Sequence, residues 1–406
     1  MASIRPFRAL RPVPEVAARV SSVPYDVVST DEARAQAAGN PLSFLHVTRS
    51  EIDLPAETDP YSDQVYAQAA RNFAELKRAA PMVVEPEPAV YFYRLRVGAQ
   101  EQTGLAACYS IDEYERDLIK KHERTRREKE DDRTRHIVTV RAQTGVVFLT
   151  YRASADVDEV AKRVCALPPL YDFTADDGVT HTVWRAERAD THALAAAFSR
   201  VPALYIADGH HRAASAARTR ATLRAEGHQA GEHDSMIAVA FPDNQVNILP
   251  YNRVVKDLAG LTPAAFLEAV RAKVPVREGP PVPVRKGEAS MFLDGRWYTL
   301  ELRAAREPGQ DRIGGLDVSI LQRVVLEDPL KILDVRTDKR IDFVGGARGT
   351  AELEKWVASG RAAVAFSLYP VTVDDLMAIA DAGGTMPPKS TWFEPKLRDG
   401  LLVHLI

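Results

Sequence analysis

The chain of 406 residues has few cysteines and no long apolar run. Its two cysteines, Cys108 and Cys165, cannot form a disulfide framework, and no Cys-x-x-Cys spacing indicates a zinc site. No stretch approaches the roughly 20 apolar residues of a membrane helix. The first residues also lack the continuous apolar region of a secretory signal. We therefore expect a cytoplasmic protein that does not enter a membrane.

The chain also has almost no excess of charge of one sign, since its net charge is only −3. This balance excludes a general electrostatic attraction to nucleic acid, and no helix-turn-helix pattern follows Arg212. The glycine-rich run "FVGGARG" matches neither a Walker nor a dinucleotide fingerprint. Any site for an anion must therefore be local. Nothing in the sequence indicates an oligomeric state.

Predicted strands and helices alternate without a strict βαβ period, which favours an α+β fold with mixed sheets and flanking helices. The runs "AVYFYRLRVG" and "QTGLAACYSI" predict neighbouring strands, and "GEASMFLDGRWYTLELRA" predicts a hairpin turning at Asp294-Gly295. Because the chain is longer than one core usually supports, we predict three regions. These are an N-terminal α+β region at 1–106, a core at 107–256 and a C-terminal α+β region at 257–406.

The stretch "YIADGHHRAASA" combines a short apolar strand, a glycine step and an alanine-rich helix. The first N–H groups of a helix lack internal partners and favour an anion, and Gly209 permits close backbone approach. Arg212 adds a planar fork for phosphate, and His210 and His211 can donate hydrogen bonds. Asp208 could hold a metal ion or orient a histidine. The pattern predicts a site for an anion, either phosphate or carboxylate.

A second informative segment, residues 112–135, is mostly charged. We predict that it is helical, with Tyr114, Leu118 and Ile119 on one apolar face. That face continues to His122 instead of another apolar residue. A carboxylate, Glu123, follows His122, so the end of this face is a candidate part of a site.

Two resemblances add to these observations. The run from Gly209 through Arg212 to Ser215 resembles the G-x-x-R-x-x-A element of the ParB and sulfiredoxin superfamily, in which it binds nucleotide phosphates. The form "DGHHR" is most similar to the free-L-serine kinases of that group. Over its whole length the chain resembles domain-of-unknown-function family 1015, sometimes labelled SpoOJ/ParB-like. The segments "LIKKHERTRREKEDDR", "YIADGHHRAASA" and "PPKSTWFEPKLRDGL" are among those that carry this second resemblance.

The resemblance implies a ParB/sulfiredoxin-like nucleotide-binding core and a kinase that moves phosphate from ATP or ADP, with Mg²⁺, to a small hydroxylated metabolite, foremost free L-serine. Glu123 would then be the general base, as is a glutamate upstream of DGHHR in the serine kinases. The expected catalytic residues are Glu123, His122 and Asp208, with Asp208 also the metal ligand. The expected phosphate-binding residues are Gly209, His210, His211, Arg212, Ser215, Lys120 and Arg133.

Other segments offer candidate substrate contacts. Lys389, Ser390 and Thr391 lie in the proline-flanked loop "PPKSTWFEP", and Asn252 and Arg253 begin a predicted strand. Tyr25 and Asp26 of "VPYD" are further candidates for a role in a site, comparable to Asn252 and Arg253. Two alternatives to the kinase stay open: a metal-dependent phosphoesterase that uses Asp208, His210 and His211 as ligands, and a non-enzymatic ParB-like nucleotide switch.

Overall fold

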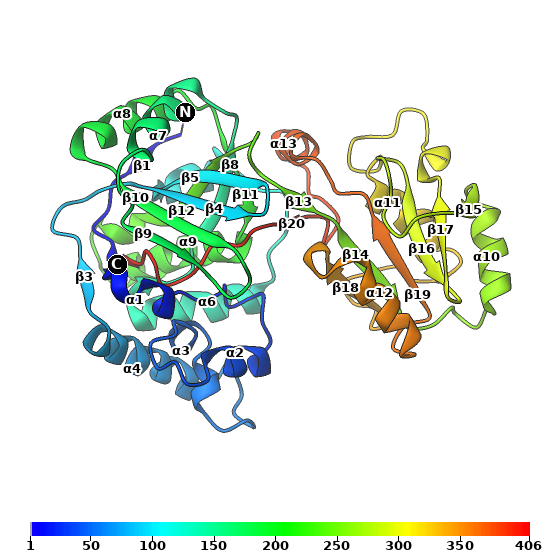
Figure 1. Ribbon diagram of the computed structural model, residues 1–406, viewed down its shortest axis with the longest axis horizontal. Coiled ribbons are helices and arrows are strands. Elements are labelled where there is room, and N and C mark those ends of the chain that lie inside the picture. Colours follow the sequence, from blue (N-terminus) through cyan, green and yellow to red (C-terminus); the bar gives the residue numbers. More distant parts are fainter. Residues whose placement is uncertain (1) are drawn as a thin grey trace. The chain divides into compact units, whose positions relative to one another are not determined.

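A computed structural model describes residues 2–406 of the chain (Figure 1). Its contacts divide the chain into two compact units. Unit 1 comprises the chain up to Val246 together with Pro395–Ile406, and unit 2 is Asn247–Glu394. Unit 2 is therefore an insertion into unit 1. Within the described residues, no helix combines the length and apolarity that crossing a membrane requires.

Unit 1 is built on a large mixed sheet with strand order β6, β11, β8, β12, β5, β4, β10 and β9, and with β1 beside β5. Strand β11 pairs parallel with β6 and antiparallel with β8, whereas β8 pairs parallel with β12. Apolar side chains from these strands, such as Leu149, Ile206 and Ala238, are completely buried. The strands are β1 (Ile4–Arg5), β4 (Tyr91–Val97), β5 (Gln100–Ser110), β6 (Ile119–Lys120), β8 (Val147–Tyr151), β9 (Tyr171–Thr174), β10 (Thr180–Arg185), β11 (Leu204–Asp208) and β12 (Ser235–Pro242).

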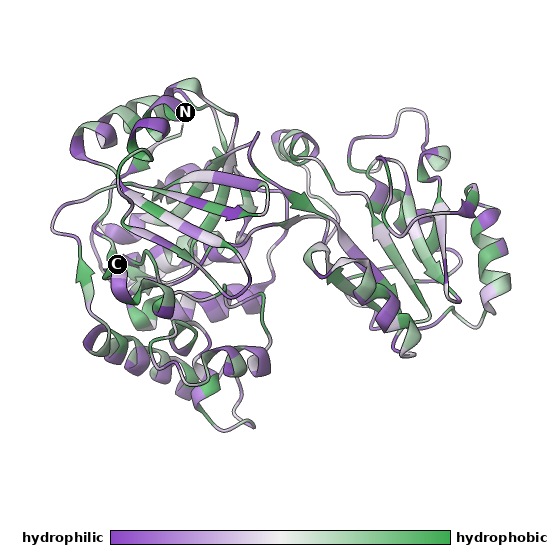
Figure 2. Cartoon of the chain, in the orientation of Figure 1, coloured by the Kyte–Doolittle hydropathy of each residue, from purple (hydrophilic) through white to green (hydrophobic). Residues whose placement is uncertain are grey.

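Helices of unit 1 bury apolar residues spaced three and four apart. In α4, for example, Val65, Ala69, Phe73 and Leu76 are buried while charged residues face outward, a mixture visible as green and purple along the helix in Figure 2. Helix α6 packs along α9. The helices are α1 (Pro14–Val20), α2 (Thr30–Ala37), α3 (Leu45–Thr48), η1 (Ser50–Asp53), α4 (Asp63–Ala79), α5 (Ile111–Glu115), α6 (Arg127–Val140), α7 (Ala155–Val164), α8 (Arg188–Phe198), α9 (His210–Ala225) and η2 (Glu232–Asp234).

Unit 2 contains an antiparallel sheet of order β15, β17, β16, β19, β14 and β18, with α12 packed on it. Its strands are β14 (Tyr251–Val255), β15 (Val276–Glu278), β16 (Ala289–Leu293), β17 (Arg296–Leu300), β18 (Ile341–Gly345) and β19 (Val364–Leu368). Its helices are α10 (Pro263–Arg271), η3 (Leu302–Ala305), α11 (Asp317–Leu321), η4 (Gln322–Leu326, a π-turn), η5 (Gly346–Arg348), α12 (Gly349–Ala358) and α13 (Val373–Asp381). Three short ladders complete the chain: β2 (Leu10–Pro12) with β3 (Met82–Val84), β7 (Ala142–Gln143) with β21 (His404–Leu405), and β13 (Ile248–Leu249) with β20 (Trp392–Phe393).

The architecture confirms an α+β fold with mixed sheets and flanking helices. The paired strands predicted around residues 90–110 are β4 and β5. The predicted hairpin is formed by β16 and β17, where Leu293 pairs with Arg296 across the Asp294-Gly295 turn.

The two units differ from the three predicted regions. The boundary predicted between residues 106 and 107 falls inside β5, and residues 395–406, predicted in the C-terminal region, belong to unit 1. There His404 of β21 pairs with Gln143 of β7, and Val403 bridges Leu10. Hydrogen bonds between distant parts of the chain hold unit 1 together. The composition of the sequence does not indicate which distant segments pair.

The continuous helix predicted for residues 112–135 is wrong. Helix α5 ends at Glu115, Asp117 adopts a left-handed φ of 57°, and α6 begins only at Arg127. Between these helices, Ile119 is fully buried and pairs with Leu204 as part of β6. Pairing at the sheet edge thus overrides the helical pattern of the charged residues.

Candidate functional site

The predicted strand-to-helix junction is formed where β11 ends and α9 begins. Gly209 joins them with φ 91° and ψ 31°, in the left-handed region that favours glycine. The ladder between β11 and β8 shifts register between Ile206 and Asp208, as is common beside functional sites. Among the described residues, no side chain caps α9, and its first turn contains no acidic residue. The helix therefore offers uncapped N–H groups and its positive dipole end to an anion.

Glu123 lies beside this junction. Its Oε2 is 3.9 Å from Nδ1 of His210, and its side chain is 40% exposed. The cause is the parallel pairing of β6 with β11, because the chain segments that follow two neighbouring parallel strands emerge at the same edge of a sheet. The structure thus brings together the charged segment and the DGHHR element.

Three histidines connect these two segments. The backbone N–H of His122 donates to Nε2 of His210 at 3.4 Å, and the N–H of Arg126 donates to Nε2 of His211 at 3.0 Å. The rings of His122 and His210 meet edge to face, 4.5 Å between centroids. Burial lowers the pKa of His122 to about 4. Burial, together with the neighbouring His122, also lowers the pKa of His210 well below its usual value. Nε2 of His210 and Nε2 of His211 therefore act as acceptors that hold the loop of Glu123, and Nδ1 of each neutral ring can carry the proton.

Asp208 has a cationic partner. Its Oδ2 accepts from Nζ of Lys396 at 2.9 Å, and its Oδ1 accepts from the N–H of Gly209 at 2.9 Å. Burial by itself would raise the pKa of Asp208, but Lys396 and Arg212 lower it well below its ordinary value. A carboxylate already neutralised by a lysine does not fit the role of magnesium ligand predicted for Asp208.

Arg212 is buried, and its guanidinium is held on two sides. Nη1 donates to the carbonyl of Val146 at 2.7 Å, and Nη2 donates to both oxygens of Asp26 at 2.8 and 2.9 Å. Asp26, from the "VPYD" segment, therefore accepts hydrogen bonds from the guanidinium that was predicted to bind phosphate. An anion at this position would have to share Arg212 with Asp26.

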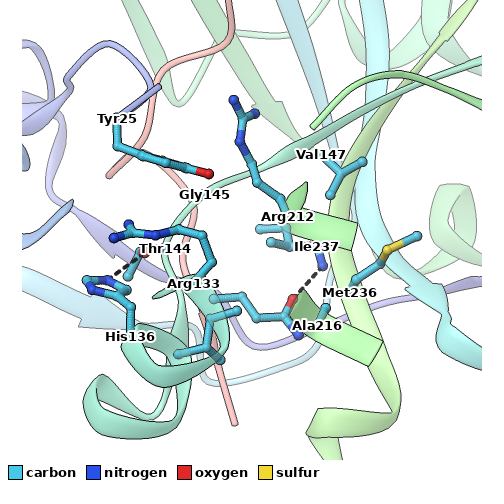
Figure 3. A pocket seen from close by; sticks show the side chains of 12 residues that line it. Tyr25, Arg133, His136, Thr144, Gly145, Val147, Arg212, Ala216, Met236 and Ile237 are labelled. Carbon is cyan, nitrogen blue, oxygen red and sulfur yellow. Dashed lines mark hydrogen bonds between the residues drawn. The ribbon is translucent and has the colours of Figure 1, made fainter. Parts of the chain in front are cut away.

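Arg133 reaches the same place from α6. It pairs with Asp132, and its guanidinium lies 4.3 Å from the centre of the Tyr25 ring, whose other neighbour is Arg212 at 5.9 Å. Figure 3 shows Tyr25, Arg133 and Arg212 around one small cavity. Its volume of about 20 Å³ suits one water molecule and not a nucleotide.

The remaining phosphate candidates of unit 1 are Ser215 and Lys120. The hydroxyl of Ser215 is buried and donates to the carbonyl of Glu130 at 3.3 Å, which fastens α9 to α6. Nζ of Lys120 lies 3.9 Å from Oδ2 of Asp117. Ser215 therefore has a packing role in this structure.

The substrate candidates of the proline-flanked loop and of the start of β14 lie in unit 2. Nη2 of Arg253 donates to the carbonyl of Lys389 at 3.0 Å, and the hydroxyl of Ser390 donates to the carbonyl of Pro387 at 2.6 Å. Oδ1 of Asn252 accepts from the N–H of Leu368 at 3.1 Å, and Thr391 directly precedes β20. Arg253 and the loop of Lys389 are thus neighbours, as parts of a unit separate from that of Glu123.

Sequence reasoning missed Lys396 and Asp399, although both lie in the segment that ends "PKLRDGL". Asp399 is 1% exposed, and within the described part of the chain its Oδ2 has no hydrogen-bond partner. Burial raises the pKa of Asp399 to about 7, against the opposing effect of Arg212. Because the segment returns from the far end of the chain, spacing alone could not place it beside Arg212.

The phosphoesterase alternative requires Asp208, His210 and His211 to converge on a metal ion. Their side chains are instead engaged by Lys396, His122 and Arg126. The described residues contain no group of three or more histidine, cysteine, aspartate or glutamate side chains arranged for a metal. This arrangement does not favour the phosphoesterase.

Solved structures resemble this chain at low identity. A conserved hypothetical protein from Pyrococcus furiosus is 14% identical, with a TM-score of 0.36 over 74% of this chain and 95% of that chain. Free serine kinase in complex with AMP is 13% identical, with a TM-score of 0.37 over 73% and 91%. SbnI with a C-terminal truncation, from Staphylococcus aureus, is 12% identical, with a TM-score of 0.40 over 74% and 87%.

No curated protein matches the chain. The family described as "Protein of unknown function (DUF1015)" matches residues 4–319, which include the junction and the loop of Glu123. This match covers more than half of the sequence, and it agrees with the resemblance carried by the quoted segments. The chain belongs to the DUF1015 family.

Proposed function

We propose that this protein is a small-molecule kinase that binds ATP or ADP at the amino end of α9 and phosphorylates free L-serine. The observation that carries the proposal is the position of Glu123. A half-exposed carboxylate lies beside the uncapped first turn of a helix of the kind that binds phosphate. The resemblance of "DGHHR" to the free-L-serine kinases supports serine as the acceptor.

In the proposed reaction the hydroxyl oxygen of the acceptor attacks the terminal phosphorus of the nucleotide. Glu123 accepts the proton that this hydroxyl loses. The bond between that phosphorus and the bridging oxygen breaks, and ATP leaves as ADP, or ADP as AMP. The N–H groups at the start of α9 would bind the transferred phosphate. The loop that carries Glu123 is fixed for this task by its backbone hydrogen bonds to His210 and His211.

Magnesium enters this proposal only as an ion bound to the nucleotide phosphates, whose charge it would neutralise. Asp208 is paired with Lys396, so no step is assigned to a metal held by Asp208. Asp208 and Lys396 instead fix the turn at Gly209, through the bond from its N–H to Asp208.

The test is conversion of L-serine to O-phosphoserine by the full chain with Mg²⁺ and either ATP or ADP, followed by mass spectrometry. Glu123→Gln keeps the shape of the side chain and removes the base, so turnover should fall about 10²–10⁴-fold with little change in nucleotide affinity. Glu128→Gln, at an exposed position in the first turn of α6, is the matched control and should retain full turnover.

Two results would contradict parts of this proposal. Absence of O-phosphoserine with both donors rejects serine as the acceptor. Product formed at the wild-type rate by Glu123→Gln keeps the kinase and rejects Glu123 as its base.

A further inference from the structure

Unit 2 contains a buried guanidinium that has no ion-pair partner among the described residues. Arg253 of β14 is 2% exposed, and among the described residues no acidic side chain lies within 4.0 Å of it. Its neighbours are the backbone carbonyls of Tyr251, Pro388 and Lys389 and the ring of Phe343. Burial without a countercharge lowers the pKa of Arg253 to about 9. Leaving a buried charge unpaired is costly, so this position indicates a missing anion.

Arg253 also retains hydrogen-bonding capacity. A guanidinium has five N–H donors, and the three bonds to the carbonyls of Tyr251, Pro388 and Lys389 use at most three of them. The loop that supplies two of these carbonyls is itself constrained, because Lys389 adopts a left-handed φ of 57°. The arrangement fixes the guanidinium in place and leaves donors for a planar anion such as a carboxylate.

A cavity of about 240 Å³ adjoins this guanidinium, and an acid without a cationic partner lines the same cavity. That acid is Glu327, whose Oε1 accepts from the neutral amide of Gln322 at 3.2 Å and which forms no ion pair among the described residues. The other acid of the lining, Asp334, is already paired with Arg336. Arg253 and Glu327 thus line one cavity with opposite charges, and neither forms an ion pair among the described residues.

We propose that unit 2 binds a free α-amino acid in this cavity, with its carboxylate on Arg253 and its ammonium group on Glu327. A zwitterion is the ligand class that satisfies both charges at once. The volume is below the usual range for drug-sized ligands, which suits a metabolite of a few heavy atoms. This site is separate from the proposed kinase site of unit 1, and the inference does not rest on that function.

The test is calorimetric titration of the full chain, without nucleotide, against L-amino acids including L-serine, and against glycerate, which has a hydroxyl where serine has its amino group. The wild-type protein should bind at least one amino acid. Glu327→Gln should lower the affinity for that amino acid about tenfold and leave the affinity for glycerate unchanged. Arg253→Lys should lower the affinity for both ligands about 10- to 100-fold, because the bidentate contact with the ligand carboxylate is lost.

The controls are Glu278→Gln and Arg296→Lys, a pair of exposed residues in the same unit, which should bind like the wild type. Thermal unfolding of each variant establishes whether it is folded. If Arg253→Lys does not fold, Glu327→Gln by itself tests the inference. The inference is overturned if the wild type binds no amino acid, if it binds inorganic phosphate alone, or if both cavity variants bind like their controls. Failure to form O-phosphoserine leaves this result unaffected, so the two proposals fail separately.

Discussion

At the scale of single residues, the interior of unit 1 depends on how a few charges are shared. Three carboxylates, those of Asp26, Asp208 and Asp399, act on Arg212, and Asp26 is the one that is hydrogen-bonded to it. Asp399 retains an oxygen without a hydrogen-bond partner among the described residues. The charged groups that act on Asp399 are Arg212, Asp26 and Arg133, from α9, the "VPYD" segment and α6. Asp399 consequently loses its proton near neutral pH.

This titration predicts a pH-dependent stability. Because burial raises the pKa of Asp399 to about 7, the native state holds a proton that the unfolded state releases near pH 4. The unfolding free energy should therefore fall as the pH rises from about 4 to about 7 and then level off. In urea titrations, Asp399→Asn should gain roughly 2–3 kcal/mol relative to wild type between pH 5 and pH 8. Asp176→Asn, an exposed change, should show a constant difference from wild type, and the same flat result for Asp399→Asn would refute the assignment.

At the scale of elements, α9 matters through its two ends. Gly209 precedes it with φ 91°, and Gly227 follows it with φ 90°. A side chain at either glycine is strained, so Gly209→Ala and Gly227→Ala should each lose about 1–2 kcal/mol of stability. Only at Gly209 would the new methyl group adjoin Arg212 and the proposed phosphate site, 3.4 Å from Cδ of Arg212. Calorimetry should show nucleotide binding weakened about tenfold by Gly209→Ala and unchanged by Gly227→Ala, whereas equal affinities would place the nucleotide elsewhere.

At the scale of the whole molecule, the chain is one unit interrupted by another. The ends of unit 2 meet each other, because Ile248 pairs with Phe393 and Leu249 with Trp392. Unit 2 also has its own apolar cluster, which includes Val254, Phe292 and Leu353. A fragment of residues 247–394 should therefore fold alone and unfold cooperatively on heating, as followed by circular dichroism. A fragment that showed no cooperative transition would mean that unit 2 needs unit 1 to fold.

Local signals were sufficient for the elements that depend on neighbours in the sequence. Richness in aromatic and β-branched residues predicted β4 and β5, and Asp294-Gly295 predicted the hairpin of unit 2. The glycine step of "DGHHR" predicted the end of β11 and the start of α9. These features follow from the backbone preferences of a few adjacent residues, which a sequence displays directly.

Only the tertiary structure decided which distant segments share a site. The expected charged helix is interrupted by β6, which pairs with β11. This strand pairing places Glu123 beside His210, which is distant from it in the sequence. The tertiary structure paired Arg212 with Asp26 and Asp208 with Lys396. It brought Asp399, from near the end of the chain, beside Ser22. It also placed Arg253 and Glu327, which form no ion pair among the described residues, in the lining of one cavity. The physical reason is that charge pairing and burial depend on distances in space, and strand pairing across the fold sets those distances.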